Sequence, residues 1–325
     1  MIGRSVAMRE LMNLIERTAS TTVPAIITGE TGTGKELTAK AIHDHSARKG
    51  PFVAVNCAAI TESLIESELF GHEKGSFTGA DRRRDGHIER ANGGTLFLDE
   101  ITEMRSDAQA KLLRVIEQKK VLRVGGTQEI PIDVRFLAAS NRPPKQAIAE
   151  GRLREDLYYR LNGLLITLPP LRKRVDDLQL LVDHFIRQAN HDHRRKIEGI
   201  DHECWQALKR YRWPGNIREL HNVVVTAVLL GPSHQISINE LPDEIRRSSS
   251  RDNCFTVYLG SPLEEIVREV INRTIAFADG NKVRASKMLR VPRRTLYDKL
   301  ARDAKQEANG RLNGNGYHSP RNGLS

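Results

Sequence analysis

The apolar residues in the first half of the chain follow two alternating patterns. Short runs rich in β-branched residues, typical of strands, alternate with stretches whose apolar residues recur at helical spacing. Strands are expected over residues 24–28, 52–56, 95–98 and 132–140, and Ser106 with Gln109 predicts a capping box that opens a helix. Because strands that alternate with helices form parallel sheets, residues 1–168 are predicted to be an α/β domain with a largely parallel sheet.

The second half has a different pattern, in which strand signals fade after Pro169 and Pro170. Helices are expected over residues 177–188, 201–211 and 216–230, so residues 169–245 are predicted to form a small α-helical subdomain. Residues 246–260 begin with a polar, serine-rich run and are predicted to be a linker. Helical patterning returns over residues 261–302, and the Gly- and Asn-rich tail, 303–325, is expected to be disordered.

Charge and cysteine content narrow the class of protein. The 325 residues carry a net charge of +10 with a pI near 9.6, which favours a polyanionic partner such as nucleic acid over charge that only maintains solubility. Three scattered cysteines, Cys57, Cys204 and Cys254, fit neither a disulfide framework nor a zinc site and indicate the reducing cytoplasm. No apolar run reaches the roughly 18 residues of a membrane span, and no signal peptide is expected at the start.

A glycine-rich run follows the first predicted strand and precedes a helical pattern. It consists of Gly29, Glu30, Thr31, Gly32, Thr33, Gly34 and Lys35. In this context glycines let backbone N–H groups turn toward phosphate, and the lysine meets the β- and γ-phosphates. Glu36 stands where the general pattern has a Ser or Thr that binds magnesium, so magnesium would be held by water, phosphate and an acid elsewhere. The alternative, a glycine-rich turn without a ligand, does not explain the flanking strand, helix and lysine.

Two acids, Asp99 and Glu100, follow the apolar strand 95–98. Asp99 is predicted to hold magnesium through water, and Glu100 to polarise the attacking water as a general base. Alone this motif is weak, because many strands end in acids. Together with the phosphate loop it predicts ATP hydrolysis.

Five motifs give residues 1–300 a resemblance to a known family. They are GETGTGKE at 29–36, FGHEKGSFTGA at 70–80, GGTLFLDE at 93–100, LREDLYYRL at 153–161 and WPGNIREL at 213–220. The chain resembles the AAA+ P-loop ATPases and, more narrowly, the bacterial enhancer-binding activators of sigma-54. The resemblance implies a parallel-sheet ATPase subdomain followed by a helical lid, and it makes Glu36 compatible with ATPase activity.

The resemblance also implies roles for residues outside the phosphate loop. Asn56 matches the residue that holds the catalytic glutamate until the nucleotide state permits its release, and Asn141 matches sensor I, which reads the γ-phosphate. Arg218 matches the sensor II arginine of the lid, whereas Arg154 and Arg160 match arginine fingers that reach a neighbouring subunit's site. Because a finger acts only where subunits adjoin, the active species is expected to be a ring, a hexamer by resemblance.

These assignments have plainer structural alternatives. Each of the arginines could instead form a surface ion pair with an acid close to it in sequence. The candidate partners are Glu155 or Asp156 for Arg154 and Arg160, and Glu219 or another lid residue for Arg218. The two asparagines could simply be turn residues at strand ends.

A glycine-hinged segment lies between the phosphate loop and the acidic strand. It consists of Gly75, Ser76, Phe77, Thr78, Gly79 and Ala80. The glycines allow the segment to change shape, and Phe77 supplies the kind of apolar anchor that dominates interfaces. The family carries GAFTGA here and uses it to contact sigma-54, whereas this chain has Ser76 in place of the usual alanine. The alternative is a buried phenylalanine that packs a turn. A second insertion, 123–129, is expected to move with this loop.

Positive charge is concentrated near the end of the chain, where residues 282–302 hold eight Lys or Arg and one acid. Two short helices, 284–289 and 293–300, predict a helix-turn-helix similar to the Fis-type domain of this activator family, with Ala285, Met288 and Leu289 turned inward. Arg290 occupies the turn position usually given to glycine; a left-handed arginine costs roughly 1 kcal/mol, so the turn is expected to deviate slightly. The predicted DNA-binding residues are Arg284, Arg293, Arg294, Thr295, Tyr297 and Lys299.

The sequence therefore predicts a cytoplasmic, ATP- and magnesium-dependent activator. It would bind upstream enhancer DNA as a dimer through helix 263–278, assemble a hexameric ring and act on the sigma-54 RNA polymerase holoenzyme. Two alternatives belong to other classes: an ATP-dependent remodeller independent of sigma-54, and a DNA-binding regulator that uses ATP only to assemble. The Phe77 loop disfavours the first, and the intact Glu100, Arg154 and Arg160 disfavour the second.

Overall fold

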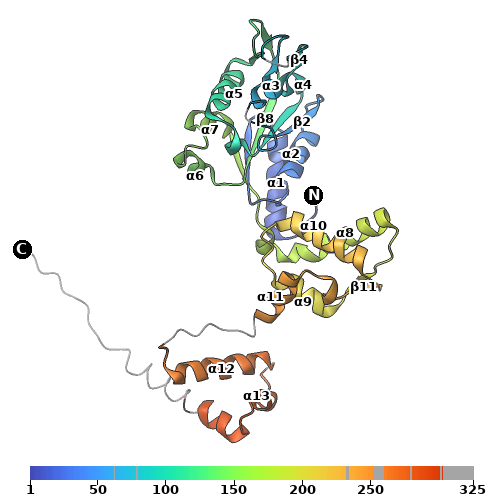
Figure 1. Ribbon diagram of the computed structural model, residues 1–325, viewed down its shortest axis with the longest axis vertical. Helices are drawn as coiled ribbons and strands as arrows, with labels where there is room; N and C mark the ends of the chain where they lie inside the picture. The colour runs from blue at the N-terminus through green and yellow to red at the C-terminus, as the bar shows by residue number, and fades with distance from the viewer. Residues whose placement is uncertain are drawn as a thin grey trace, which may run out of the picture. The chain divides into compact units, whose positions relative to one another are not determined.

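The computed structural model describes residues 1–61, 63–77, 80–231, 234–251, 260–278, 280–300 and 302. Met1–Arg246 forms one compact unit, and a second unit begins at Arg247 (Figure 1). Thr78, Gly79 and the predicted tail, 303–325, lie outside the described residues, as does most of the predicted linker. No helix in the described ranges combines the length and apolarity needed to cross a membrane.

A five-stranded parallel sheet forms the centre of the first unit, in the order β2-β5-β8-β1-β9. Its strands are β1 (Ala25–Thr28), β2 (Phe52–Asn56), β5 (Thr95–Asp99), β8 (Arg135–Ser140) and β9 (Leu164–Thr167). The first four correspond to the predicted strands, although β8 begins three residues later than expected. The fifth, β9, was not predicted; it pairs with β1, with Ala25 opposite Leu164. This crossover order, with both faces covered, is typical of the P-loop fold and confirms the predicted fold class.

Helices cover both faces of the sheet (Figure 1), and its three central strands, β5, β8 and β1, are buried along almost their whole length, whereas the edge strands β2 and β9 are partly exposed. Ile27, Phe97 and Leu137 pack against α1 (Val6–Ala19) and α2 (Lys35–Asp44) on one face. The opposite face packs against α3 (Ile65–Phe70), α4 (His87–Arg90), α5 (Ser106–Gln118) and α7 (Glu155–Leu161). The remaining elements of this part are α6 (Pro144–Ala149), η1 (Ile101–Glu103) and the hairpins β3 (Gly71–His72) with β4 (Arg84–Asp85) and β6 (Lys120–Leu122) with β7 (Glu129–Pro131).

The helical lid follows the sheet within the same unit, except for the end of its last helix, which extends beyond Arg246. Its helices are η2 (Leu171–Lys173), η3 (Val175–Asp177), α8 (Leu178–His193), α9 (His202–Arg210), α10 (Asn216–Leu230), η4 (Ile238–Glu240) and α11 (Asp243–Arg251). They enclose a core around the buried Trp213, and the short strands β10 (Gly199–Ile200) and β11 (Gln235–Ile236) pair in parallel. Helix α11 runs through residues 246–251, which were predicted to begin the linker.

The capping-box prediction at the start of α5 is wrong. Arg105 occupies the N-cap, and no side-chain capping bond is present there. Gln109 is instead buried, and its amide nitrogen donates to the carbonyl oxygens of Met104 and Arg152, each at 2.8 Å. Its amide oxygen accepts from the backbone N–H of Arg154 at 2.9 Å, so this glutamine fixes the start of α7 rather than that of α5.

The second unit contains α12 (Leu263–Phe277), α13 (Lys282–Met288) and a further helical stretch, residues 293–300. Ile271, Ala285 and Leu296 form its small core. Met288, predicted to face inward, is 46% exposed because it lies on the outer side of α13. Arg290 adopts φ of +54°, so the turn keeps the left-handed conformation despite the arginine, although a slight deviation was expected.

Candidate active site and interaction surfaces

The phosphate-loop run, residues 29–35, joins the end of β1 to the start of α2, at the carboxyl edge of the parallel sheet. Gly32 and Gly34 adopt φ of +78° and +100°, a region that favours glycine. A Cβ added at Gly32 would lie 2.2 Å from the carbonyl oxygen of Gly215 in the lid. Gly32 is therefore required both by its own conformation and by the close approach of the lid.

Lys35, the first residue of α2, is buried and folds back onto the loop. Its Nζ donates to the carbonyl oxygens of Gly29 at 2.9 Å and Glu30 at 3.3 Å. Burial lowers the pKa of Lys35, while the charges of Asp99 and Glu100 oppose that shift. The structure thus brings together the three groups that sequence reasoning assigned to phosphate and water.

The two acids occupy the end of β5. Glu100 has a left-handed backbone, φ +54°, and its N–H donates to Oδ1 of Asp99 at 3.0 Å. Oδ2 of Asp99 has no hydrogen-bond partner in the described part of the chain. This arrangement leaves Asp99 able to bind water and Glu100 able to accept a proton.

The two predicted asparagines end the strands on either side of β5. Asn56 lies opposite Asp99 in the β2–β5 register, and its Oδ1 accepts from the N–H groups of Ala58 at 2.9 Å and Ala59 at 3.2 Å. No hydrogen bond joins Asn56 to the Glu100 side chain among the described residues, so its holding role stays a prediction. Asn141 follows β8, and its Oδ1 is buried without a hydrogen-bond partner in the described ranges. A buried, unpaired amide at this edge fits a residue that contacts a ligand.

Arg218 lies over the phosphate loop on the first turn of α10. A Cβ at Gly32 would lie 3.1 Å from the Arg218 Cβ, and the Arg218 charge contributes to lowering the pKa of Lys35. The alternative pairing with Glu219 is not seen. The Glu219 carboxylate accepts instead from the Tyr211 hydroxyl at 2.9 Å and the Gly215 N–H at 2.8 Å.

Sequence reasoning missed three lid residues that contact the loop: Arg172, Arg174 and Asn216. Arg172 donates to both carboxylate oxygens of Glu30, at 2.7 and 2.5 Å, and these bonds lower the pKa of Glu30 to about 2. Arg174 and Asn216 donate to loop carbonyl oxygens. Asn216 belongs to the WPGNIREL motif, which offered a signal, whereas nothing local marks the two arginines.

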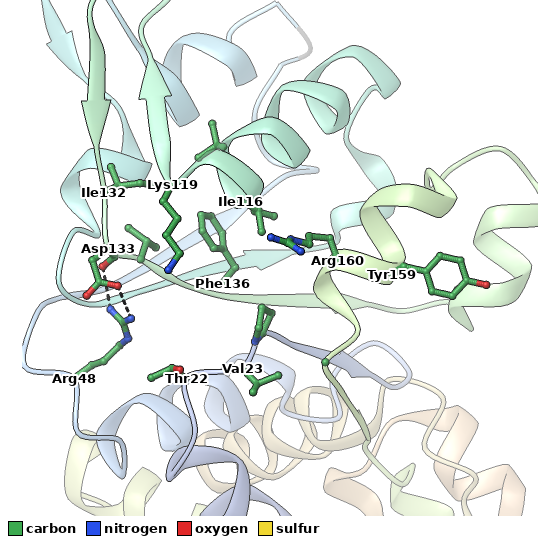
Figure 2. Close-up of a pocket in the computed structure, with 14 residues that line it drawn as sticks. Thr22, Val23, Arg48, Ile116, Lys119, Ile132, Asp133, Phe136, Tyr159 and Arg160 are labelled. Atoms are coloured by element: carbon green, nitrogen blue, oxygen red, sulfur yellow. Dashed lines mark hydrogen bonds and ion pairs between the residues drawn. The ribbon is translucent and has the colours of Figure 1, made fainter.

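The two candidate fingers lie on α7, outside the chain's own nucleotide site. Arg154 is exposed and donates to Asp156 at 3.1 and 2.7 Å, which is the pairing that the structural alternative predicts. Arg160 is exposed and lines a pocket of about 450 Å³ together with Ile116, Phe136 and its neighbour on the same helix, Tyr159 (Figure 2). No ion pair to Arg160 is found within the described ranges.

The described part of the 75–80 segment forms a tight turn between β3 and β4. The N–H of Gly75 donates to the carbonyl oxygen of Ala80 at 2.8 Å, closing the base of the loop. Phe77 is 39% exposed, and its ring meets the edge of His72 at 5.1 Å between centroids. Phe77 is therefore not fully buried, as a phenylalanine that only packs a turn would be. Its ring still contacts the rest of the domain, at His72.

A buried arginine joins this loop to the second insertion. The guanidinium of Arg123 donates to Glu73 at 2.9 Å, Asp85 at 2.9 Å and Glu89 at 2.8 and 2.5 Å. These carboxylates, Glu89 first, raise the pKa of Arg123, and its side chain is only 4% exposed. Backbone bonds add to the connection, since the N–H of Glu73 donates to Val124 at 3.1 Å. The two insertions therefore form one structural unit.

Replacing Gly125 with alanine should lower the free energy of unfolding by about 3 kcal/mol. Gly125 has φ of +73°, and an added Cβ would lie 2.6 Å from the Cβ of Ser76. The left-handed backbone and the overpacked contact each cost roughly 1–2 kcal/mol. Urea unfolding measures the change. Gly151→Ala is the matched control, because Gly151 has φ of +70° and nothing within 4 Å of an added Cβ. Equal losses for the two variants would contradict a tight contact between the loops.

The basic residues of the second unit that were predicted to bind DNA are exposed. The N–H groups of Val283 and Arg284 donate to Asn281, which caps α13, and Lys282 lies over the Tyr297 ring at 5.4 Å. The side chains predicted to bind DNA are all exposed: Arg284, Arg293, Arg294, Thr295, Tyr297 and Lys299. The residue between them that faces inward is Leu296, which is 1% exposed.

Glu36 points to solvent rather than into a metal site. Within the ranges that the structure covers, no three His, Cys, Asp or Glu side chains gather as a metal site of protein ligands requires.

Comparisons with known proteins match each of the three folded parts of the chain. Three family models match: the sigma-54 interaction domain over residues 1–167, the AAA+ ATPase lid domain over 172–255 and the bacterial regulatory protein, Fis family, over 262–302. The transcriptional regulatory protein ZraR of Salmonella typhimurium is 46% identical over 305 residues, which cover 93% of this chain and 68% of ZraR. The DNA-binding transcriptional regulator NtrC of Rhizobium meliloti is 42% identical over 92% of this chain and 69% of NtrC.

A solved structure with a bound nucleotide is also similar. The crystal structure of NtrX from Brucella abortus in complex with ADP has a TM-score of 0.73 and 35% identity, and the match covers 93% of this chain and 69% of NtrX. The same protein in complex with ATP has a TM-score of 0.72.

Proposed function

The chain belongs to the sigma-54-dependent transcriptional activators, an AAA+ family with a Fis-type helix-turn-helix, and from that premise we propose how it works. It binds upstream enhancer DNA, assembles a ring and hydrolyses ATP. Hydrolysis drives the Phe77 loop against sigma-54 and converts the closed promoter complex of the polymerase into the open complex. The observation that carries this proposal is the convergence of Lys35, Asp99 and Glu100 at one edge of the sheet.

The residues at this edge suit a nucleoside triphosphate. The loop N–H groups and the start of α2 would cradle the phosphates, Lys35 would leave the carbonyls of Gly29 and Glu30 for the phosphate oxygens, and Arg218 would approach from the lid. Asn141, whose Oδ1 is buried without a hydrogen-bond partner in the described ranges, would turn its amide N–H groups to the terminal phosphate, because an amide oxygen cannot donate to a phosphate oxygen. The ATP complex of the relative NtrX supports nucleotide binding by this fold.

Asp99 fits magnesium through water because one of its oxygens has no hydrogen-bond partner in the described part of the chain. Magnesium, when bound, would neutralise phosphate charge. Glu100 would orient the attacking water and take its proton, a contribution worth roughly 10²–10⁴ in rate. Asn56 would regulate Glu100 from the neighbouring strand.

Arg154 and Arg160 would complete the site of the neighbouring subunit. An arginine supplied in trans stabilises charge on the transferred phosphoryl group and contributes roughly 10³–10⁵ in rate. Arg154 would first have to leave Asp156, an exposed pair that costs little to break. We therefore propose that hydrolysis depends on the assembly of a ring, which we take to be a hexamer.

The helix-turn-helix would bring the ring to its promoter. We propose that α12 pairs two copies and that exposed basic side chains, Arg293 and Arg294 among them, contact the DNA. Binding to phosphates would make the affinity fall as salt rises. Bending of the DNA between the upstream site and the promoter would then bring the Phe77 loops into contact with the polymerase.

The test is open-complex formation by purified sigma-54 polymerase on a supercoiled promoter carrying the upstream site. We expect open complexes with the activator and ATP, and none with a non-hydrolysable analogue. Opening without hydrolysis would contradict the proposed mechanism. DNA opening by the activator and ATP in the absence of sigma-54 would favour a remodeller of another class.

A further inference from the structure

Three successive carbonyl groups of the phosphate loop accept hydrogen bonds from the lid. The Thr31 oxygen accepts from Nδ2 of Asn216 at 3.0 Å, and the Gly32 oxygen accepts from the N–H of Ile217 at 2.9 Å. The Thr33 oxygen accepts from the guanidinium of Arg174 at 3.3 Å. All three donors lie more than 135 residues beyond the loop in sequence, so the contact exists only when the lid is docked.

The direction of these bonds matters for phosphate binding. The N–H and C=O of a peptide unit point in opposite directions, so a loop whose N–H groups turn toward an anion turns its carbonyls away from it. Such carbonyls lie close together and need partners when they are buried. Here the lid supplies the partners, and it comes so close that Gly32 has no room for a side chain.

We propose that Asn216 and Arg174 are positioning residues that preform the phosphate-binding loop by holding its outward carbonyls. Docking of the lid and binding of nucleotide are then coupled, because each requires the same loop conformation. This inference rests on the proposed function, since it assumes that ATP binds at this loop. It assigns a role in nucleotide affinity to two residues that do not themselves contact the nucleotide.

The surroundings of Asn216 in the lid hold its side chain in one orientation. It is fully buried, and its backbone adopts φ of +52°, which asparagine tolerates better than most residues. Its Oδ1 accepts from the N–H of Leu171 at 2.8 Å, which orients the amide and directs Nδ2 at the loop. A second Nδ2 contact reaches Glu30 at 3.2 Å.

Arg174 is held by contacts with the N-terminal helix as well as with the loop. Its side chain is buried, with one guanidinium nitrogen donating to Sδ of Met8 at 2.8 Å in α1. Asp177, fully buried nearby, accepts from the N–H groups of Arg4 at 2.6 Å and Ser5 at 2.8 Å. The charge of Asp177 favours the charged form of Arg174, although burial lowers the arginine's pKa.

The same lid offers a control contact of a different kind. Arg172 also binds the loop, but it does so through the Glu30 side chain, and both partners are about two-fifths exposed. Removing Arg172 deletes a lid–loop contact without freeing a carbonyl. The proposal therefore distinguishes Arg174 and Asn216 from Arg172.

The experiment measures ATP binding to the full chain by titration calorimetry, together with steady-state hydrolysis. Arg174→Met and Asn216→Gly should each raise the Kd for ATP about tenfold, which corresponds to about 1.4 kcal/mol. KM should rise with Kd, while kcat stays within about threefold, because the acids and Lys35 are untouched. Arg174→Lys should recover part of the affinity, and Arg172→Met should raise Kd by less than threefold. Asn216→Gly keeps the positive φ available and removes only the side chain.

Several outcomes would overturn the inference. They are an unchanged Kd in Arg174→Met, a fall in kcat with no change in Kd, and an effect of Arg172→Met as large as that of Arg174→Met. Thermal unfolding would reveal whether Asn216→Gly folds. If it does not, the inference is tested by the Kd for ATP of Arg174→Met compared with that of Arg174→Lys. Failure of the unmodified chain to bind ATP would instead contradict the proposed function.

Discussion

Replacing Glu100 with glutamine should reduce kcat for ATP hydrolysis by about a thousandfold while the Kd for ATP changes less than threefold. Glutamine has nearly the same shape, so the left-handed turn at this position and the bond from its N–H to Asp99 should persist. It cannot accept the proton of the attacking water, and loss of a general base typically costs 10²–10⁴ in rate. A coupled assay of phosphate release and a binding titration measure the two quantities.

The matched control is Glu103→Gln. Glu103 lies three residues further on, in η1, and its carboxylate is about one-third exposed and pairs with Arg152 at 3.4 Å. Such partly exposed pairs contribute little, so kcat should stay within about twofold. If Glu100→Gln kept more than a tenth of the original kcat, another group would have to serve as the base. Asn56 and Lys35 would not qualify, because an amide and an ammonium cannot take up a proton at neutral pH.

The strands were predictable wherever local composition decides the structure. The runs around β1, β2, β5 and β8 are apolar and end in polar or turn residues, which is a local signal. Strand β9 was not predicted because it is short and partly exposed, and its position is set by pairing with β1. The capping-box motif at Ser106 misled for the same reason, since the buried contacts of Gln109 with Arg152 and Arg154 outweigh a local cap.

The residues of the candidate site were likewise predictable where a local pattern marks them and not where long-range contacts place them. Lys35, Asp99 and Glu100 could be predicted because each directly follows a strand or glycine-rich run that fixes its place in a P-loop fold. The donors from Arg174 and Asn216 lie 141 and 185 residues from their acceptors, and no local pattern encodes such a distance. The hydrogen bonds through which Arg123 joins the two insertions also connect residues distant in sequence, so no local pattern predicts them.

Replacing Phe77 with alanine should abolish activation of sigma-54 transcription while ATP hydrolysis stays within about twofold. Phe77 lies far along the chain from Lys35 and Glu100, and its described contact is with the edge of His72, so the nucleotide site should not change. Its exposed ring is the large apolar group of the loop, and truncating an aromatic anchor typically costs 2–4 kcal/mol of binding. An in vitro transcription assay and an ATPase assay on the same preparation measure both effects.

Leu230→Ala is the control, because Leu230 is 70% exposed at the end of α10 and far in sequence from the loops. Its loss removes more exposed apolar surface than is visible at Phe77, yet transcription should be unchanged if the position of the ring is what matters. Phe77→Leu, which keeps part of the apolar surface, should retain partial activity. Full transcription by Phe77→Ala would remove the loop from the mechanism. Loss of ATPase activity together with transcription would show that Phe77 supports the fold through His72 rather than contacting sigma-54.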